Sequence, residues 1–357
     1  MIPRSVTAAI AALLMLAAST GIAETLLVVR KSDHALEFVD PGSGLRLASV
    51  PVGFAPHEVS VAPDGRRAVV SNYGTREQPG ASLSIVDLER PAEIRRIDLG
   101  PHRRPHGVAW YAPARIAVTT EGSGHLLVVD PDEARVVSAI ATGQETSHMV
   151  AVSSDGRRAY VTNIGSGTTT AIDLEAGRKL VDIATGKGSE GLALTPDGRE
   201  LWVGARAEDR IAVVDTATLA VVASLPAPGI PIRVAMSPDG RLAWVTCAGA
   251  STLLAFEVAS RRVTTERHVE PPLAPGAAER PFARLAPGSA LPVGLVASRG
   301  GHAVYVAATM ADRVLVFDPA TSAELRSVDV GGEPDGMGAT PALPKVSCGG
   351  CGPDGAP

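Results

Sequence analysis

The chain is patterned as short apolar runs separated by turn residues. In one stretch, Met149 to Ser153 and Ala159 to Thr162 flank the turn Asp155-Gly156, and the runs Thr169 to Asp173 and Lys179 to Ile183 follow. An Asp-Gly pair between two apolar runs is a strong signal for a β-hairpin. The stretch therefore predicts four short antiparallel strands in succession.

The same pattern recurs about every 42 residues. The hairpin aspartate falls at positions 64, 155, 197 and 239, and the gap of 91 between the first two spans two repeats with a degenerate turn at Pro113-Ala114. An acidic residue that closes an apolar run occurs seven times, as Asp40, Asp87, Asp130, Asp173, Asp215, Glu257 and Asp318. Four short strands per repeat of this length are typical of a propeller blade, whereas β-solenoid repeats are shorter and carry fewer strands. The pattern predicts an all-β, seven-bladed β-propeller with four antiparallel strands per blade.

The two ends of the repeat array predict how the ring closes. The first copy starts inside a blade, at Thr25 to Val29, and lacks its innermost strand. A strand around Gly336 to Thr340, after Pro334-Asp335, supplies the missing one. We therefore expect the N- and C-terminal strands to share one blade, which removes the open edges of the array.

Residues 1–23 read as a signal peptide, with Arg4 before the apolar run Val6 to Ala18 and small residues at Gly21-Ile22-Ala23. A membrane anchor is the alternative, but a spanning helix needs about 20 apolar residues. The expected organisation is a signal peptide at 1–23, a propeller at 24–341 and a flexible Gly/Pro/Cys tail at 342–357. We expect a periplasmic or secreted protein with no membrane span after signal removal.

Composition narrows the range of partners. The formal net charge is −5 and the 33 basic residues form no stripe, which disfavours nucleic acid. Three cysteines are too few for a disulfide scaffold. Cys348 and Cys351 in the tail predict a local disulfide, with metal binding as the alternative, and Cys247 reads as a small core residue. We expect a monomer whose partner is a small molecule or a periplasmic protein.

One repeated position gathers candidate chemistry. The residue seven positions before the hairpin aspartate should begin the innermost strand of each blade and face the mouth of the central channel on its top face. Around the ring this position holds His57, His106, His148, Glu190, Ile232, Val293 and Asp335. The next position adds Glu58 and Arg233, and the end of the second strand adds Asn72, Glu121, Asn163 and Arg206. The top face is therefore the predicted ligand-binding site.

The three histidines suggest specific chemistry. Imidazoles beside carboxylates suit a divalent metal such as zinc or copper, with His57, His106 and His148 as candidate ligands. The same groups also suit acid–base catalysis. The alternative is a structural role, in which the Pro-His turn recurs because it connects the preceding loop to the innermost strand. There is no Cys-x-x-Cys-His motif for covalent c-type haem and no Gly-x-Ser-x-Gly motif.

An insertion precedes the last repeat. The gap from Glu257 to Asp318 exceeds the usual spacing by 19 residues, and the extra segment, roughly 270–291, is rich in Pro, Ala and Gly. It should lie on the top face, either as a cover with Arg280, Phe282 and Arg284 facing inward or as a disordered surface loop.

Tyr160-Val161-Thr162-Asn163 resembles the signature of the YVTN β-propeller repeat proteins, with variants at Ala68 to Asn72, Leu201 to Ala205 and Ala243 to Cys247. The resemblance extends to about Thr340 and implies the propeller fold, but folds of this kind serve many roles. Pro56-His57-Glu58 followed by Ser71 to Gly74 is similar to lactonase-type propellers, which would imply hydrolysis of a sugar lactone by Glu58, His57 or Arg233. The histidine position also resembles the cytochrome d1 propeller, which holds a non-covalent haem under histidines.

These observations favour an exported, non-enzymatic YVTN-type propeller that binds a ligand or a partner protein at the top of its channel. The alternatives are a lactonase-like hydrolase and a metal- or haem-binding propeller that uses His57, His106 and His148.

Overall fold

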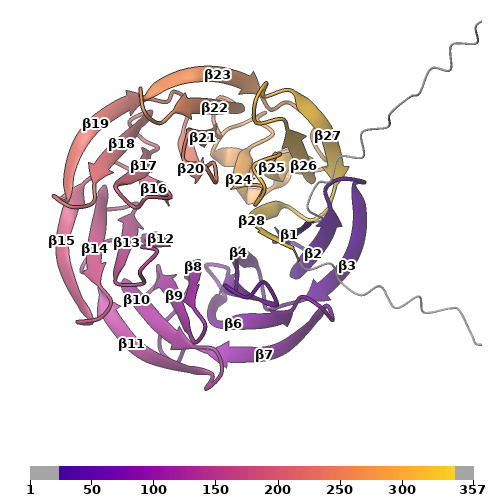
Figure 1. Ribbon diagram of the computed structural model, residues 1–357. Helices are drawn as coiled ribbons and strands as arrows, with labels where there is room; N and C mark the ends of the chain where they lie inside the picture. The colour runs from indigo at the N-terminus through magenta and orange to yellow at the C-terminus, as the bar shows by residue number, and fades with distance from the viewer. Residues whose placement is uncertain (1–23, 342–357) are drawn as a thin grey trace, which may run out of the picture.

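The computed structural model describes residues 24–341, which form a closed ring of seven four-stranded antiparallel sheets (Figure 1). The first blade contains β28 (Pro334–Thr340), β1 (Thr25–Arg30), β2 (Ala35–Asp40) and β3 (Leu45–Pro51). The second contains β4 (Pro56–Val61), β5 (Arg67–Gly74), β6 (Pro79–Asp87) and β7 (Ala92–Asp98). The third contains β8 (Pro105–Ala112), β9 (Arg115–Thr120), β10 (His125–Asp130) and β11 (Arg135–Ala141). The seven-bladed, all-β prediction is confirmed.

The remaining blades repeat the arrangement. The fourth contains β12 (Ser147–Val152), β13 (Arg158–Asn163), β14 (Thr168–Asp173) and β15 (Arg178–Ala184). The fifth contains β16 (Ser189–Leu194), β17 (Glu200–Ala205), β18 (Arg210–Asp215) and β19 (Ala220–Pro226). The sixth contains β20 (Pro231–Met236), β21 (Leu242–Cys247), β22 (Thr252–Glu257) and β23 (Arg262–His268), and the seventh contains β24 (Pro292–Ala297), β25 (Val304–Ala308), β26 (Arg313–Phe317) and β27 (Glu324–Asp329).

The Asp-Gly hairpins end the innermost strands at the bottom face. At the turn between β4 and β5, Gly65 has a φ of 71°, which is a left-handed conformation that glycine adopts without strain. The Asp64 side chain accepts a hydrogen bond from the Arg66 amide at 2.9 Å and so fixes the turn. The degenerate turn at Pro113-Ala114 does separate β8 from β9, as predicted.

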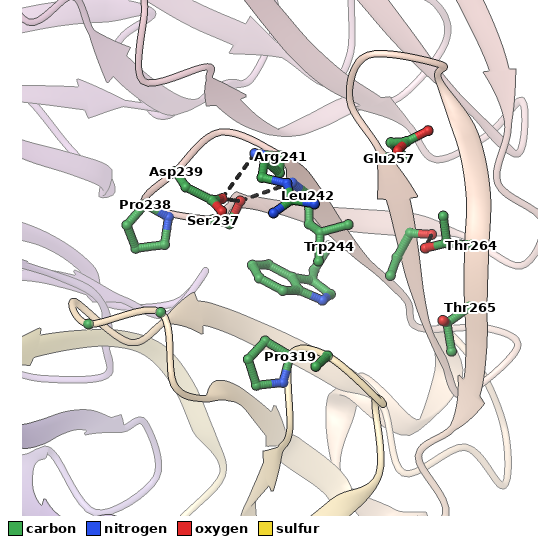
Figure 2. A pocket seen from close by; sticks show the side chains of 14 residues that line it. Ser237, Pro238, Asp239, Arg241, Leu242, Trp244, Glu257, Thr264, Thr265 and Pro319 are labelled. Atoms are coloured by element: carbon green, nitrogen blue, oxygen red, sulfur yellow. Dashed lines mark hydrogen bonds between the residues drawn. The ribbon is translucent and has the colours of Figure 1, made fainter. Parts of the chain in front are cut away.

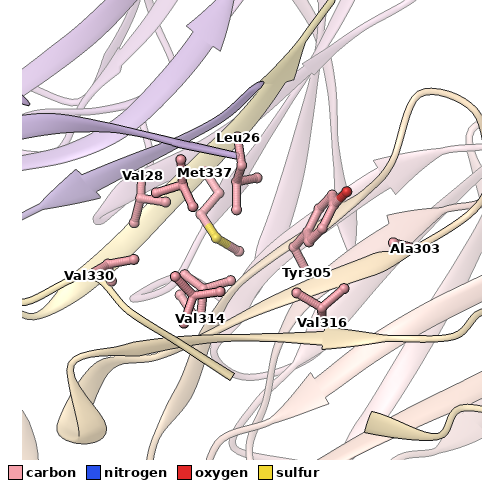
Figure 3. Packing of buried hydrophobic residues seen from close by; sticks show 11 residues of the cluster. Leu26, Val28, Ala303, Tyr305, Val314, Val316, Val330 and Met337 are labelled. Atoms are coloured by element: carbon pink, nitrogen blue, oxygen red, sulfur yellow. The ribbon is translucent and has the colours of Figure 1, made fainter. Parts of the chain in front are cut away.

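The ring closes through its two ends. β1 pairs antiparallel with β28 in the register Thr25 to Thr340 and Leu26 to Ala339, which confirms the predicted closure. Leu26 and Met337 from this blade pack against Tyr305 and Val314 of the seventh blade (Figure 3). The closing contact is thus both a hydrogen-bonded ladder and an apolar interface.

The core lies between neighbouring blades. Tyr160, Trp202 and Trp244, which occupy equivalent places in β13, β17 and β21, are each at most 1% exposed. The outermost strands are mostly exposed, and β11 and β19 each bury a single residue near their end. Cys247 is buried in β21, as expected of a small core residue.

Candidate functional site

The seven innermost strands line the channel (Figure 1) and place the same position at its mouth. The second residue of each strand is the residue that the repeat spacing selects: His57 (β4), His106 (β8), His148 (β12), Glu190 (β16), Ile232 (β20), Val293 (β24) and Asp335 (β28). The predicted equivalence of these positions around the ring agrees with the strand bounds.

A backbone feature repeats just before each of these strands. The preceding residue has a positive φ in every blade: Ala55 (42°), Arg104 (57°), Thr146 (57°), Gly188 (73°), Ile230 (64°), Leu291 (54°) and Glu333 (53°). Six of these residues are not glycine, so the conformation is strained and must be held by the surrounding contacts. This kink directs the chain from the top loop into the strand at the same angle in each blade.

Threonine hydroxyls from the second strand hold the start of the innermost strands. Thr162 Oγ1 accepts a hydrogen bond from the Met149 amide at 3.1 Å and donates one to the Glu190 carbonyl of the next blade at 2.5 Å. Thr119 Oγ1 likewise accepts from the Gly107 amide at 2.9 Å and donates to the His148 carbonyl. The threonine of the YVTN pattern therefore sets the position of the mouth residues in two adjoining blades.

Three histidines and two neighbours form the first cluster at the mouth. The ring centroids of His106 and His148 are 3.8 Å apart, and those of His57 and His106 are 4.9 Å apart. Glu121, which follows β9, accepts a hydrogen bond from His148 Nδ1 at 2.5 Å through Oε1 and one from Tyr73 Oη at 2.5 Å through Oε2. The three imidazoles are only 5–8% exposed.

The three histidines carry different charges. Burial holds the pKa of His57 and His106 well below the usual value, and neighbouring cations lower it further. Burial also opposes charge on His148, but its hydrogen bonds and charge interactions with Glu121 and Glu190 outweigh that effect and raise its pKa to about 9. One imidazolium is therefore stacked on a neutral imidazole at neutral pH.

A second cluster joins opposite sides of the channel. Arg233 Nη2, from β20, forms an ion pair with Glu58 Oε1, from β4, and lies 3.8 Å from Asp335 Oδ1. Asp335 Oδ2 is 3.4 Å from Lys31 Nζ and 3.3 Å from His57 Nδ1. Burial raises the pKa of Glu58 to about 7, although the charge of Arg233 works against that shift. The two clusters meet at His57.

The potential metal ligands are a subset of the first cluster. His106, Glu121 and His148 each offer a ligand atom, and these atoms lie within 4.8 Å of one another. His57, the third histidine of the predicted metal set, contacts Asp335 instead and lies outside this group. His106 Nδ1 is buried and has no hydrogen-bond partner among the described residues. A buried ring nitrogen without a hydrogen-bond partner, next to two other ligand atoms, has the chemistry of a metal-binding position.

The other predicted site residues divide into two groups. Glu190 accepts from Arg206 at 2.6 Å and lies 3.6 Å from His148 Nε2, so both belong to the mouth. Asn72 and Asn163 are buried, and their side-chain amides hydrogen-bond near their own strands, Asn72 to Ser82 and Ser84 and Asn163 to Thr168 and Thr170. Their role here is to hold the ends of β5 and β13 in place.

The sequence analysis did not select three residues of the mouth. Tyr73 packs against His57 with centroids 4.2 Å apart, and the Arg104 guanidinium lies 4.5 Å from the centre of the Tyr73 ring. Lys31 follows β1 and reaches Asp335 from the first blade. Tyr73 and Lys31 occupy the same position at the end of the second strand as Glu121 and Arg206, so the strand-end rule could have found both, whereas Arg104 lies outside the two repeat positions.

The insertion at 270–291 forms two short 3₁₀ helices, η1 (Ala277–Glu279) and η2 (Pro281–Arg284). Its Phe282 ring lies 3.5 Å from Lys31 Nζ, which places part of the insertion over the mouth as predicted. The inward orientation expected of Arg280 is wrong, because its guanidinium makes two 2.7 Å bonds to Asp312. That ion pair fixes the insertion to the seventh blade.

A groove of about 670 Å³ lies at the opposite face, between the hairpins of the sixth and seventh blades (Figure 2). It is lined by the turn Ser237 to Asp239, by Gly300-Gly301 and by Trp244. An equivalent groove lies between the fifth and sixth blades, at Pro196 and Gly240. Since the grooves recur with the blades, they reflect blade packing more than a specific site.

Comparisons with known proteins support the fold. A profile of the Cytochrome D1 heme domain matches residues 113–254, which is less than half of the chain. A structure titled Kuenenia stuttgartiensis hydrazine synthase is similar with a TM-score of 0.65 and 22% identity over 82% of this chain and 92% of that one. A functionally unknown protein from Desulfotomaculum acetoxidans DSM 771 is similar with a TM-score of 0.72 and 14% identity, over 90% of this chain and 99% of that one. No curated protein sequence is significantly similar to this chain.

Three predictions concern residues outside the described range 24–341, namely the signal peptide at 1–23, the flexible tail at 342–357 and the Cys348–Cys351 disulfide within it. Within that range, no helix is long and apolar enough to cross a membrane.

Proposed function

We propose that the protein is a metal-binding β-propeller that holds one divalent transition-metal ion at the top of its channel, between His106, Glu121 and His148. The observation that supports this most directly is the convergence of three ligand atoms within 4.8 Å in a buried mouth. The ligands come from two adjoining blades, so the closed ring and not a flexible loop positions them.

Accepting an ion requires the ligand side chains to rotate. Zinc–ligand bonds of about 2.1 Å place neighbouring tetrahedral ligands about 3.4 Å apart. His148 Nδ1 and Glu121 Oε1 are 2.5 Å apart and would have to separate to that distance, while the stacked rings of His106 and His148 would have to turn so that a nitrogen of each faces the ion. Metal binding displaces the proton of His148, because a metal ligand must be neutral imidazole.

The surrounding groups also support the assignment. Metal-bound histidines usually donate their other ring N–H to a carboxylate, and Glu190 Oε1 lies 3.6 Å from His148 Nε2. Tyr73 Oη orients the outer oxygen of Glu121 at 2.5 Å. These contacts would fix both ligands when His148 Nδ1 and Glu121 Oε1 bind the ion.

Two imidazoles and one carboxylate select among metals. Such a set suits zinc, copper or ferrous iron, whereas magnesium and calcium prefer oxygen ligands alone. Three protein ligands leave at least one position open for an external molecule. The proposal therefore keeps the expected ligand-binding role of the top face.

Haem fits these residues poorly. The rings of His57, His106 and His148 stack on one another, and an iron porphyrin would have to separate them to reach an axial nitrogen. His148 Nδ1 and His57 Nδ1 already contact Glu121 and Asp335. We therefore derive no haem chemistry from the Cytochrome D1 match, which in any case begins beyond His106.

The hydrolase alternative stays a hypothesis. Its best support is Glu58, since a carboxyl group with a pKa of about 7 is suited to general acid–base catalysis. Membership of the YVTN family and a periplasmic or secreted location are further parts of the proposal, and cell fractionation tests the second.

Metal content tests the main proposal. The protein is purified without chelator or histidine tag, and bound metal is measured by mass spectrometry and by titration with Co²⁺, whose absorption reports its ligands. We expect one equivalent of metal, with affinity reduced about 100-fold or more in His106→Ala and His148→Ala. The control His302→Ala removes an exposed histidine and should bind normally. Equal metal binding by the wild type and the His106→Ala/His148→Ala double variant would refute the proposal.

A further inference from the structure

Arg233 crosses the mouth of the channel. It lies in the sixth blade and its Nη2 pairs with Glu58 of the second blade, although the seventh and first blades stand between them in the ring. A side chain can bridge these blades only by extending over the channel. The guanidinium is therefore inside the mouth, where it is only 8% exposed.

One arm of this guanidinium has no partner. Arg233 Nη1 is buried and forms no hydrogen bond within the described part of the chain. Both acidic neighbours, Glu58 and Asp335, engage Nη2 instead. A buried N–H group of a charged side chain that stays unpaired is costly, so it indicates a partner that the chain itself does not supply.

A second cation contacts the same carboxylate as Arg233. Lys31 Nζ is 3.4 Å from Asp335 and 3.5 Å from the centre of the Phe282 ring, and Lys31 is only 8% exposed. Asp335 thus lies between Arg233 and Lys31, and both cations contact it at long distances of 3.8 and 3.4 Å. Loose contacts of this kind leave both cations able to accept another anion.

We infer that Arg233 and Lys31 form a subsite for a small organic carboxylate at the channel mouth. A carboxylate oxygen is a strong acceptor for a guanidinium N–H group, and the unpaired Nη1 arm would supply that hydrogen bond. The two nearby carboxylates disfavour a dianion such as phosphate, and the tight burial favours an anion of the size of formate. The inference rests on the proposed function only in that the subsite and the metal ligands lie in the same channel mouth. His57 contacts both Asp335 and His106 and so lies between the two groups.

The arrangement explains why the mouth holds two clusters. A carboxylate on Arg233 would lie near Glu58 and Asp335, in the same mouth as the histidine cluster. The Phe282 ring on Lys31 would cover this side, since the Arg280–Asp312 pair holds the insertion in place. The subsite would therefore select small acids that enter beside the insertion.

Formate is the probe that tests the subsite. Binding of ¹³C-formate is measured by NMR line broadening at constant ionic strength, first in metal-free protein and then after zinc is added. We expect saturable binding by the wild type. In Arg233→Gln the affinity for formate should fall by about 10- to 100-fold, which corresponds to the free energy of one hydrogen bond to a charged group. Arg76→Gln removes an exposed charge from the same face outside the mouth and should leave formate binding unchanged.

Further variants separate a damaged fold from a lost subsite. Arg233→Lys keeps a cation opposite Glu58 but lacks the second arm, so it should unfold at the same denaturant concentration as the wild type yet bind formate about tenfold more weakly. If the wild type shows no saturable binding, or if Arg233→Gln binds as tightly, the inference is overturned.

The metal and the anion can also be distinguished. His106→Ala should lose zinc but retain formate binding when metal-free. Formate binding that appears only with zinc and disappears in His106→Ala would make formate a metal ligand and overturn the Arg233 subsite. Formate binding without any metal binding would instead refute the proposed function and leave the subsite standing.

Discussion

Replacing Thr162 by valine tests whether the YVTN threonine holds the channel mouth together. The substitution keeps the β-branched shape and removes one hydroxyl group. That hydroxyl is fully buried and serves two backbone groups, the Met149 amide at 3.1 Å and the Glu190 carbonyl at 2.5 Å. The change therefore leaves one donor and one acceptor unpaired in the interior.

The expected loss follows from these two groups. Each buried polar group left without a partner costs about 1–3 kcal/mol, and the added methyl group recovers about 0.8 kcal/mol. We expect Thr162→Val to lower the free energy of unfolding by about 1–5 kcal/mol. Guanidinium unfolding followed by circular dichroism measures it.

The chain contains a matched control. Thr246 occupies the same place in β21 as Thr162 does in β13, but its hydroxyl is buried and has no hydrogen-bond partner among residues 24–341. Thr246→Val should therefore change stability by less than about 0.5 kcal/mol, or increase it. Equal losses in the two variants would refute the reasoning, since the threonine would then matter for its shape and not for its hydrogen bonds.

Four further predictions concern charge and packing. In metal-free protein, His148 has a pKa raised from 6.5 to about 9, so its stabilising effect is complete below pH 6.5 and is lost as the pH rises to 9, by up to about 3 kcal/mol. His148→Gln should abolish this loss in unfolding titrations, and parallel curves would contradict it. Glu58 has a pKa raised from 4.5 to about 7, so stability should also fall by up to about 3 kcal/mol between those values, and Glu58→Gln should remove that slope. In Gly294→Ala the new Cβ would overlap the Asp335 carbonyl of the next blade, so thermal melting should show a loss well beyond the roughly 1 kcal/mol expected of Gly100→Ala, where only the positive φ opposes the change. Leu26→Ala, in the closing interface, should cost about 2–5 kcal/mol in guanidinium unfolding, and a loss below about 1 kcal/mol would mean that the hydrogen-bonded ladder alone closes the ring.

Much of the fold could be predicted because propeller blades are local. A hairpin such as Asp64-Gly65 and the apolar runs beside it are specified by neighbouring residues, and the repeat then carries the same result around the ring. The closure by β28 was also predictable, since a missing strand at one end matched an extra strand at the other. The place of His57, His106 and His148 at the mouth followed from the same spacing.

The composition of the site was predictable only in part. Repeat equivalence selects the residues at the start of the innermost strand in each blade. It therefore identified His106 and His148 as candidate metal ligands, but it placed His57 in the same set. It has no information on side-chain direction, and therefore could not show that Glu121 completes the group while His57 contacts Asp335. It also assigned Asn72 and Asn163 to the ligand site, although their side-chain amides bond near their own strands.

The sequence by itself determined the number of blades, the closure and the ring of positions at the channel mouth, because each depends on periodicity and on contacts between close neighbours. Only the tertiary structure decided which of those positions meet. Arg233 and Glu58 are 175 residues apart and belong to different blades, and they pair because the closed ring brings their blades to face one channel. Contacts across a channel depend on its width and on the length of each side chain, and no local pattern encodes either quantity.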